Sequence, residues 1–216
     1  MKMSHGRPEF APQFAPGPAN ENEGVQEPKG EADRLAETSI GDDALPNLSS
    51  CGFLFLDGTA ITSQGVQKLA ESKTLIDLSI QRTAVDDAAV PSLVKIKTLT
   101  WLLVWDTKIS GEGLFTLRNA LPKCKVDGPV VDFSFNPAAP GPVGGGWKPR
   151  MERLLWLNKA QHLKLVVLAD PSVTDGHLAT LEGLDHLEVL DLRGASVTDA
   201  GVQRLQKALP KLKIHR

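Results

Sequence analysis

A unit of 24 residues repeats along this chain. Copies begin at Cys51, Leu75 and Leu99 and, after an interruption, at Leu163 and Leu187. In each copy the first, fourth and sixth residues are apolar, and the last two of them have the alternation of a short strand. These last two are Leu54 and Leu56, Leu78 and Ile80, Leu102 and Val104, Val166 and Leu168, and Leu190 and Leu192. A fixed period of this length is typical of a protein built from stacked repeats.

The second half of each unit has the pattern of a short helix. Five residues after the last strand position comes a β-branched residue, and the residue that follows it is Thr62, Asp86, Ser110, Thr174 or Thr198. Side-chain oxygens of these types cap helices by accepting hydrogen bonds from the first free amides. Apolar pairs spaced three residues apart then predict one inward-facing helical stripe. Because an ordinary strand–helix–strand crossover needs about 30 residues or more, 24 residues favour a tight coil that stacks on its neighbours.

These residues carry a resemblance to a known family. The pattern L-x-x-L-x-L, followed by G-T-x-I-T, R-T-x-V-D, D-T-x-I-S or G-A-S-V-T-D-A-G, resembles the leucine-rich repeats of bacterial and ribonuclease-inhibitor-like proteins. It covers roughly residues 38–126 and 150–216. The resemblance implies an α/β solenoid shaped like a horseshoe, with parallel strands on the concave face and short helices on the convex face. It also implies protein–protein binding on the concave strands. Thr59, Thr83 and Thr107 occupy a column that holds Asn or Cys in many members, and their hydroxyls are expected to bond the neighbouring coil.

The domain organisation follows from the period and from where it is interrupted. Residues 1–37 contain several prolines and no apolar periodicity, so we expect a disordered N-terminal tail. The repeat domain is expected to span residues 38–216, with an irregular repeat and a Pro/Gly-rich insertion at about 123–162. A 40-residue unit in one continuous stack is the preferred arrangement, because a separate array of two units could hardly bury a core. Two separate arrays are the alternative, since ALPKCKV and ALPKLKI both look like the closing segment of a stack.

Strand positions between the buried ones should point to the concave face. Five apolar side chains at such positions form the predicted binding site: Phe53, Phe55, Trp101, Leu103 and Trp105. Aromatic side chains that point outward among a few polar ones are typical of an interface. The alternative is that Phe133, Phe135 and Trp147 of the insertion fold back and cover this patch.

Residue clusters with the chemistry of an enzyme are not found in the sequence. His162 and His186 stand 24 residues apart and should lie in neighbouring coils, but no third metal ligand is evident. Cys124 has no histidine partner, and the aspartates at the helix starts have the positions of caps. The segment GPVGGGW lacks the Lys-Ser/Thr that follows a phosphate-binding loop. We therefore expect no catalytic residues, no metal and no cofactor.

Composition restricts the partners and the location. The formal net charge of −2 gives no reason to expect binding to nucleic acid or to a membrane. Two cysteines and no apolar leader favour a cytoplasmic protein. The prediction is a non-enzymatic, monomeric module that binds a protein partner of unknown identity through its concave face. The alternative function is a substrate-recognition adaptor of a larger, ubiquitin-ligase-like enzyme complex.

Overall fold

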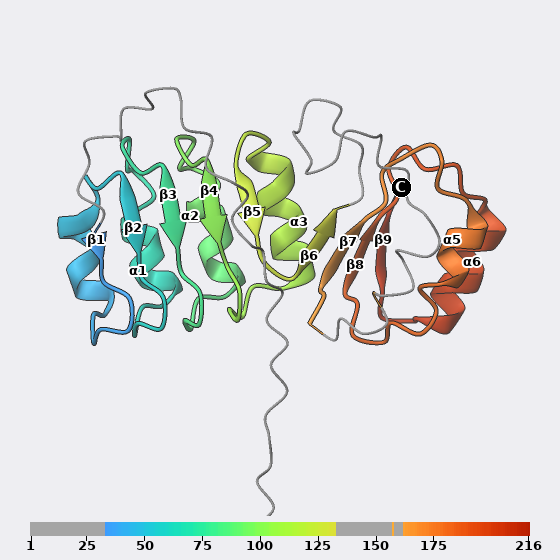
Figure 1. Cartoon of the computed structure of the whole chain (residues 1–216), viewed down its shortest axis with the longest axis horizontal. Helices are drawn as coiled ribbons and strands as arrows, with labels where there is room; N and C mark the ends of the chain where they lie inside the picture. The colour runs from blue at the N-terminus through green and yellow to red at the C-terminus, as the bar shows by residue number, and fades with distance from the viewer. Residues whose placement is uncertain (1–32, 133–156, 158–161) are drawn as a thin grey trace, which may run out of the picture.

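The computed structural model describes residues 33–132, 157 and 162–216. Its strands form two parallel sheets that lie side by side (Figure 1). The first sheet consists, in order, of β1 (Asp33–Arg34), β2 (Phe53–Phe55), β3 (Asp77–Ser79), β4 (Trp101–Leu103) and β5 (Lys125–Asp127). The second consists of β6 (Val130–Asp132), β7 (Leu165–Val167), β8 (Val189–Asp191) and β9 (Lys213–His215). We call each sheet with its helices the first array and the second array.

Short helices follow the strands and complete the coils. The first array has η1 (Asp42–Leu48), α1 (Ser63–Lys68), η2 (Asp87–Ala89), α2 (Val90–Leu93) and α3 (Gly111–Ala120). The second array has α5 (Asp175–Ala179) and α6 (Asp199–Ala208). Each of these α-helices except α2 directly follows one of the predicted capping residues, and in the α2 coil Asp86 caps the preceding η2. The helical half of the predicted unit is therefore confirmed.

The predicted strand positions form the core. Partner strands pair with an offset of 24 residues, as in Leu54 opposite Leu78 and Leu78 opposite Leu102. All the predicted apolar strand positions are buried except Cys51, which is half-buried. Val197 and Val202, in the coil of α6, are also only half-buried, and α6 is the last helix of the described residues. The repeat pattern therefore predicts the core correctly up to the ends of each stack.

The threonine column makes a different hydrogen bond from the one expected. Thr59, Thr83 and Thr107 donate to the carbonyl oxygen three residues earlier in their own coil, at 2.6, 2.6 and 2.9 Å. The short threonine side chain reaches only the turn from which it starts, so the expected bond to the neighbouring coil is wrong. Bonds between coils come from another column, where the Thr98 hydroxyl donates to the Leu75 carbonyl at 2.6 Å.

Aspartates near the helix starts accept hydrogen bonds from the N-cap residue of the following coil's helix. Asp175 accepts hydrogen bonds from the hydroxyl and the amide of Thr198, at 2.6 and 2.8 Å. These bonds stabilise the carboxylate and hold the pKa of Asp175 below its ordinary value. The same kind of contact joins Asp42 to Thr62 and Asp87 to Ser110. Successive coils are therefore linked at their helix starts as well as through their strands.

In the helix of the following coil, a glycine leaves space for the carboxylate of the aspartate. A Cβ atom added at Gly113 would lie 2.3 Å from Asp87 Oδ1 and 2.8 Å from Ile109 Cγ2. Gly113→Ala is therefore expected to lower the free energy of unfolding by about 1–2 kcal/mol through overpacking, measured by urea denaturation. Gly183→Ala is the control, because a Cβ there has no neighbour within 4 Å. Equal stability of the two variants would contradict this explanation of the repeated glycine.

Two expectations about domain organisation need correction. The tail was expected to extend through residue 37, but β1 already pairs with β2 at Asp33 and Arg34. The preferred single stack was also wrong, because β5 pairs with β4 while β6 pairs with β7 in a separate sheet. The second stack buries a core of its own, to which β6 and the buried Leu157 contribute beside β7, β8 and β9. Most of the insertion lies outside the described residues, and the other limits of the repeat domain stay a prediction.

Helix α3 joins the two arrays. In Figure 1 it lies between β5 and the second sheet. Leu165, Val167 and Val189, which project from the second sheet, are buried in the same hydrophobic cluster as Leu114 and Leu117 of α3. The second sheet therefore packs its strand face onto a helix of the first array.

Candidate functional site

The strand face of the first array is the face of its sheet that points away from the helices. Parallel pairing places its side chains in rows, one from each strand and about 4.8 Å apart. One row contains Phe53, Asp77, Trp101 and Lys125, and the next contains Phe55, Ser79, Leu103 and Asp127. Asp57, Gln81 and Trp105 continue the face beyond the strand ends. All five residues of the predicted site thus belong to this face.

The two tryptophans are the most exposed part of the predicted site. Trp101 is 40% exposed and Trp105 37%, whereas Phe53, Phe55 and Leu103 are half-buried. The Trp105 indole donates from Nε1 to Asp127 Oδ1 at 3.2 Å, and the Lys125 ammonium lies 5.3 Å from the centre of the Trp101 ring. Both indoles are therefore held in position by neighbouring charged side chains while part of each ring faces solvent.

A polar strand divides the aromatic residues into two groups. Asp77 and Ser79 of β3 lie between the phenylalanines of β2 and the residues of β4. Ser79 donates a hydrogen bond to Asp57, and the Asp57 carboxylate also accepts from the backbone N–H of Gln81 at 2.9 Å. The site therefore consists of two apolar groups with carboxylates between them.

The strand face of the second array is not open. By the same alternation, six strand positions of this array were expected to point to the concave face: Leu165, Val167, Ala169, Val189, Asp191 and Arg193. Leu165, Val167, Val189 and Asp191 are instead buried, whereas Ala169 is half-buried and Arg193 is exposed. The four buried side chains cover α3, whose Phe115 ring stacks on His215 with the ring centres 3.8 Å apart. The physical reason is that three of these four side chains are apolar, so packing against a helix removes them from water.

Hydrogen bonds surround this contact between the arrays. The Gly111 amide donates to Glu188 Oε2 and the Lys164 ammonium donates to the Ile109 carbonyl, each at 2.6 Å. Burial opposes the ionisation of Asp191, but hydrogen bonds and the charge of Arg193 outweigh it, so the pKa of Asp191 lies below its ordinary value. The second array is therefore fixed to α3 by matched polar groups as well as by apolar packing.

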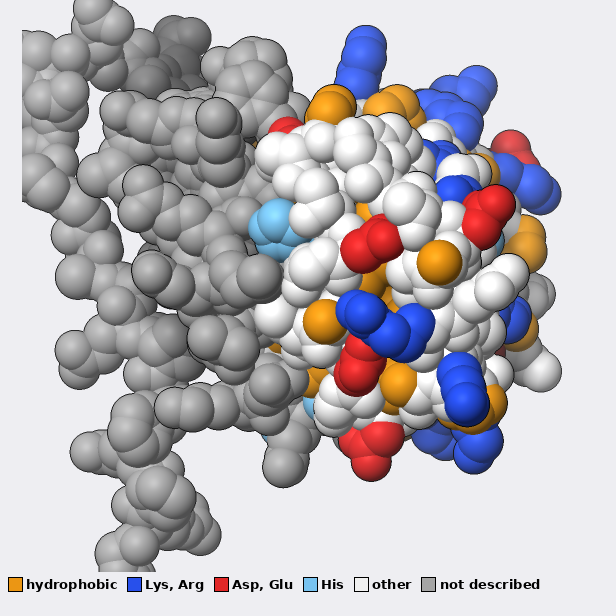
Figure 2. Space-filling model, turned by 90° about the vertical axis from the view of Figure 1, so that its right-hand side faces the viewer, with side chains coloured by type: hydrophobic (Ala, Val, Ile, Leu, Met, Phe, Trp, Pro, Cys, Tyr) orange, Lys and Arg blue, Asp and Glu red, His pale blue; other side chains and the backbone are white. Residues whose placement is uncertain are grey.

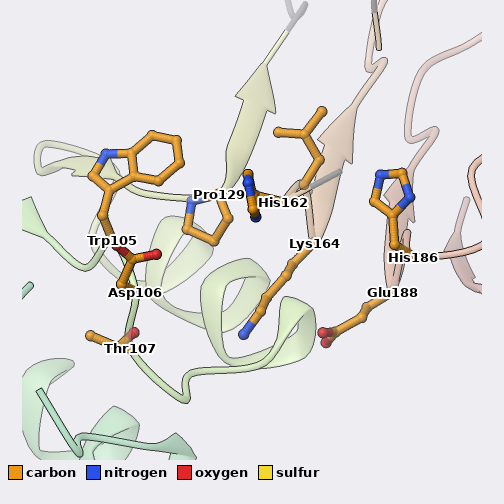
Figure 3. A pocket seen from close by; sticks show the side chains of 9 residues that line it. Trp105, Asp106, Thr107, Pro129, His162, Lys164, His186 and Glu188 are labelled. Carbon is orange, nitrogen blue, oxygen red and sulfur yellow. The ribbon is translucent and has the colours of Figure 1, made fainter. Parts of the chain in front are cut away.

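A pocket of about 310 Å³ lies where the two arrays meet. Figure 3 shows the Trp105 indole on one side, His162 and His186 across from it, and Pro129 between them. The two histidines lie in neighbouring coils, as their 24-residue spacing predicted, and both line this pocket. Within the described residues, no group of three His, Cys, Asp or Glu side chains is placed to hold a metal ion.

Cys124 does not have the low thiol pKa that a nucleophilic cysteine needs. Burial and the nearby Asp77 raise the pKa of Cys124 to about 11, so its thiol is protonated at neutral pH. Cys51 is half-buried, although its strand position predicted a fully buried thiol.

The helix side of the second array has a different character. Figure 2 shows Lys and Arg next to Asp and Glu on this side, with hydrophobic side chains scattered between them. Ion pairs such as Arg204–Glu182 and Arg216–Asp199 connect some of these charges. No helix in the described part of the chain is long and apolar enough to span a membrane.

A coil of one strand and one short helix, stacked through parallel pairing at a fixed period, is the leucine-rich-repeat fold. No family model and no curated protein matches this sequence. Among solved structures, the chain is similar to an internalin of Listeria monocytogenes, with 20% identity and a TM-score of 0.34 over 84% of this chain and 46% of the internalin. It is also similar to a leucine-rich-repeat protein of Leptospira interrogans, with 17% identity and a TM-score of 0.32 over 85% of this chain and 35% of that one.

A third similar structure is a protein of Bacteroides fragilis, with 13% identity and a TM-score of 0.27 over 80% of this chain and 58% of that one. This chain therefore spans less than two thirds of the length of each of the three proteins.

Proposed function

We propose that this protein is a non-enzymatic interaction module that binds a protein partner through the strand face of the first array. The observation that carries this proposal is the exposure of Trp101 and Trp105 on that face. Only one other large hydrophobic side chain, Ile76, is exposed in the described part of the chain. Tryptophan is enriched among the residues that contribute most to protein–protein binding.

The rest of the surface supports this choice of face. Stacked coils create extended surfaces of parallel strands, which repeat proteins use for binding. The corresponding face of the second array is already occupied by α3, and the helix side of that array displays scattered charges (Figure 2). The strand face of the first array thus combines exposed aromatic side chains with an extended, repetitive surface.

Binding should depend on the two tryptophans while folding should not. Trp101→Ala or Trp105→Ala is expected to weaken the complex by about 2–4 kcal/mol if the residue is a hot spot. We would capture partners from a lysate of the source organism with the wild-type protein and with the double variant, and identify them by mass spectrometry. A specific partner should be lost with the double variant and retained with Gln203→Ala, which changes an exposed residue of α6.

Thermal melts of the same variants distinguish binding from stability. The melting temperature of the double variant should stay close to that of the wild type, because both indoles are partly exposed and lie outside the core. Capture of the same proteins by all variants would argue against this face as the binding site. A large loss of melting temperature would show that the tryptophans serve the fold instead.

A further inference from the structure

One row of the strand face places a carboxylate between two aromatic rings. Phe53 pairs with Asp77 and Asp77 pairs with Trp101 in the register of β2, β3 and β4. Adjacent strands lie about 4.8 Å apart, so both rings are within reach of a group bound at the carboxylate. Aromatic faces attract cations and a carboxylate pairs with them. This row therefore has the composition of a site for a positively charged side chain.

The carboxylates of this face have capacity for another donor. Asp77 accepts a hydrogen bond of 2.8 Å from the Thr100 hydroxyl, and Asp57 accepts from Ser79 and Gln81. A carboxylate offers about four acceptor positions. Neither Asp57 nor Asp77 forms an ion pair with any residue that the structure describes. Both are only partly buried, so a partner can reach them.

The same face already shows how a cation is bound on it. The Lys125 ammonium lies 5.3 Å from the centre of the Trp101 ring and 3.7 Å from Asp127 Oδ2. Lys125 comes from β5, on one side of Trp101, whereas Asp77 comes from β3, on the other side. The position at Asp77 thus has the same two kinds of group, an indole and a carboxylate, but has no lysine of its own.

From this arrangement we infer that the partner presents a basic segment, with an arginine side chain received at Asp77 between Phe53 and Trp101. Arginine suits the position better than lysine because its planar guanidinium both stacks on aromatic rings and pairs with a carboxylate through two hydrogen bonds. The inference rests on the proposed function and specifies the chemistry of the partner.

A labelled peptide tests the charge preference directly. The probe is a fluorescein-labelled peptide of alternating arginine and serine, compared with the same peptide containing citrulline, which keeps the shape of arginine but is neutral. Binding to the full chain is followed by fluorescence anisotropy. The citrulline peptide should bind at least about tenfold more weakly, and Asp77→Asn should weaken binding of the arginine peptide by about tenfold. Trp101→Leu should have a similar effect.

Asp43→Asn is the matched control for non-specific attraction. Asp43 lies on η1, its side chain is fully exposed, and it pairs with Lys68 at 3.3 Å. Its removal changes the net charge as Asp77→Asn does, but it should leave binding unchanged. Equal effects of the two variants, or equal affinities of the two peptides, would overturn the inference.

A second experiment separates this inference from the proposed function. Random 12-residue peptides are selected by display on the wild-type protein, and the selected peptides are tested against Trp101→Ala. Arginine-rich peptides that depend on Trp101 would support both proposals. Peptides that depend on Trp101 but contain no excess of basic residues would overturn the inference and leave the proposed function standing. Peptides indifferent to Trp101 would contradict both.

Discussion

Replacing Leu78 with alanine is expected to lower the free energy of unfolding by about 2–5 kcal/mol. Leu78 is fully buried in β3 and lies in register between Leu54 and Leu102, so its side chain supports the coil on either side. Truncation removes apolar contacts and leaves a cavity that neighbouring strands cannot close without losing their pairing. Since domains are stable by only about 5–15 kcal/mol, the loss is a large fraction of the total. Urea denaturation followed by circular dichroism measures it.

Ile76→Ala provides the comparison for this variant. Ile76 precedes the same strand and loses a side chain of equal size, but it is 38% exposed. Its replacement should cost about 1 kcal/mol or less, because little buried surface is lost. If the two variants had equal stability, the register assigned to the strands would be wrong.

Gly111→Val is expected to separate the second array from α3. A Cβ at Gly111 would lie 2.7 Å from the Lys164 carbonyl oxygen and 2.9 Å from Glu188 Cβ, both in the second array. A backbone oxygen cannot move aside as a side chain can, so the cost should reach the upper part of the overpacking range, about 3 kcal/mol. We expect unfolding to change from one transition to two, as docking is lost while each array keeps its own core.

Gly41→Ala controls for the general effect of replacing a glycine, since a Cβ there meets nothing within 4 Å. Its unfolding curve should match that of the wild type. A radius of gyration measured by small-angle X-ray scattering should rise for Gly111→Val and stay constant for Gly41→Ala. An unchanged radius and a single transition in Gly111→Val would show that the contact at α3 does not hold the arrays together.

The coil itself could be predicted from the sequence because its determinants are local. Burial at Leu54 and Leu56, capping at Thr62 and the following helical pair all fall within one 24-residue unit. The same pattern in each copy makes the register of the sheet unambiguous, since a shift by one residue would turn every apolar side chain outward. Fold class and core were therefore predictable without any long-range information.

The docking of the second array was not predicted, because it depends on a contact between segments far apart in the sequence. Two signals for it are nevertheless present. In the second array, Leu163–Ala169 is apolar on both faces except at Lys164, as expected for a strand buried on both sides. Gly111 also departs from its column, where the other units have Ser63, Asp87, Asp175 and Asp199.

The placement of five apolar residues on one strand face could be predicted from the sequence, but the arrangement of the polar residues among them could not. The sequence places Phe53, Phe55, Trp101, Leu103 and Trp105 on one face, and the structure places them in its rows. The apolar residues alone could not indicate that carboxylates lie between them and are placed to pair with a basic side chain. Asp77 is an unremarkable strand residue in the sequence, and its position between two rings depends on the pairing of three strands.

Hydroxyl-radical footprinting with a selected binder tests the central claim most directly. Trp101 and Trp105 are 40% and 37% exposed, so both should be oxidised in the free protein and identified by mass spectrometry. At saturating binder, oxidation of both tryptophans should fall severalfold, while exposed residues of α6 such as Arg204 stay unchanged. Unchanged oxidation of both tryptophans in the saturated complex would contradict the claim that the partner binds the strand face of the first array.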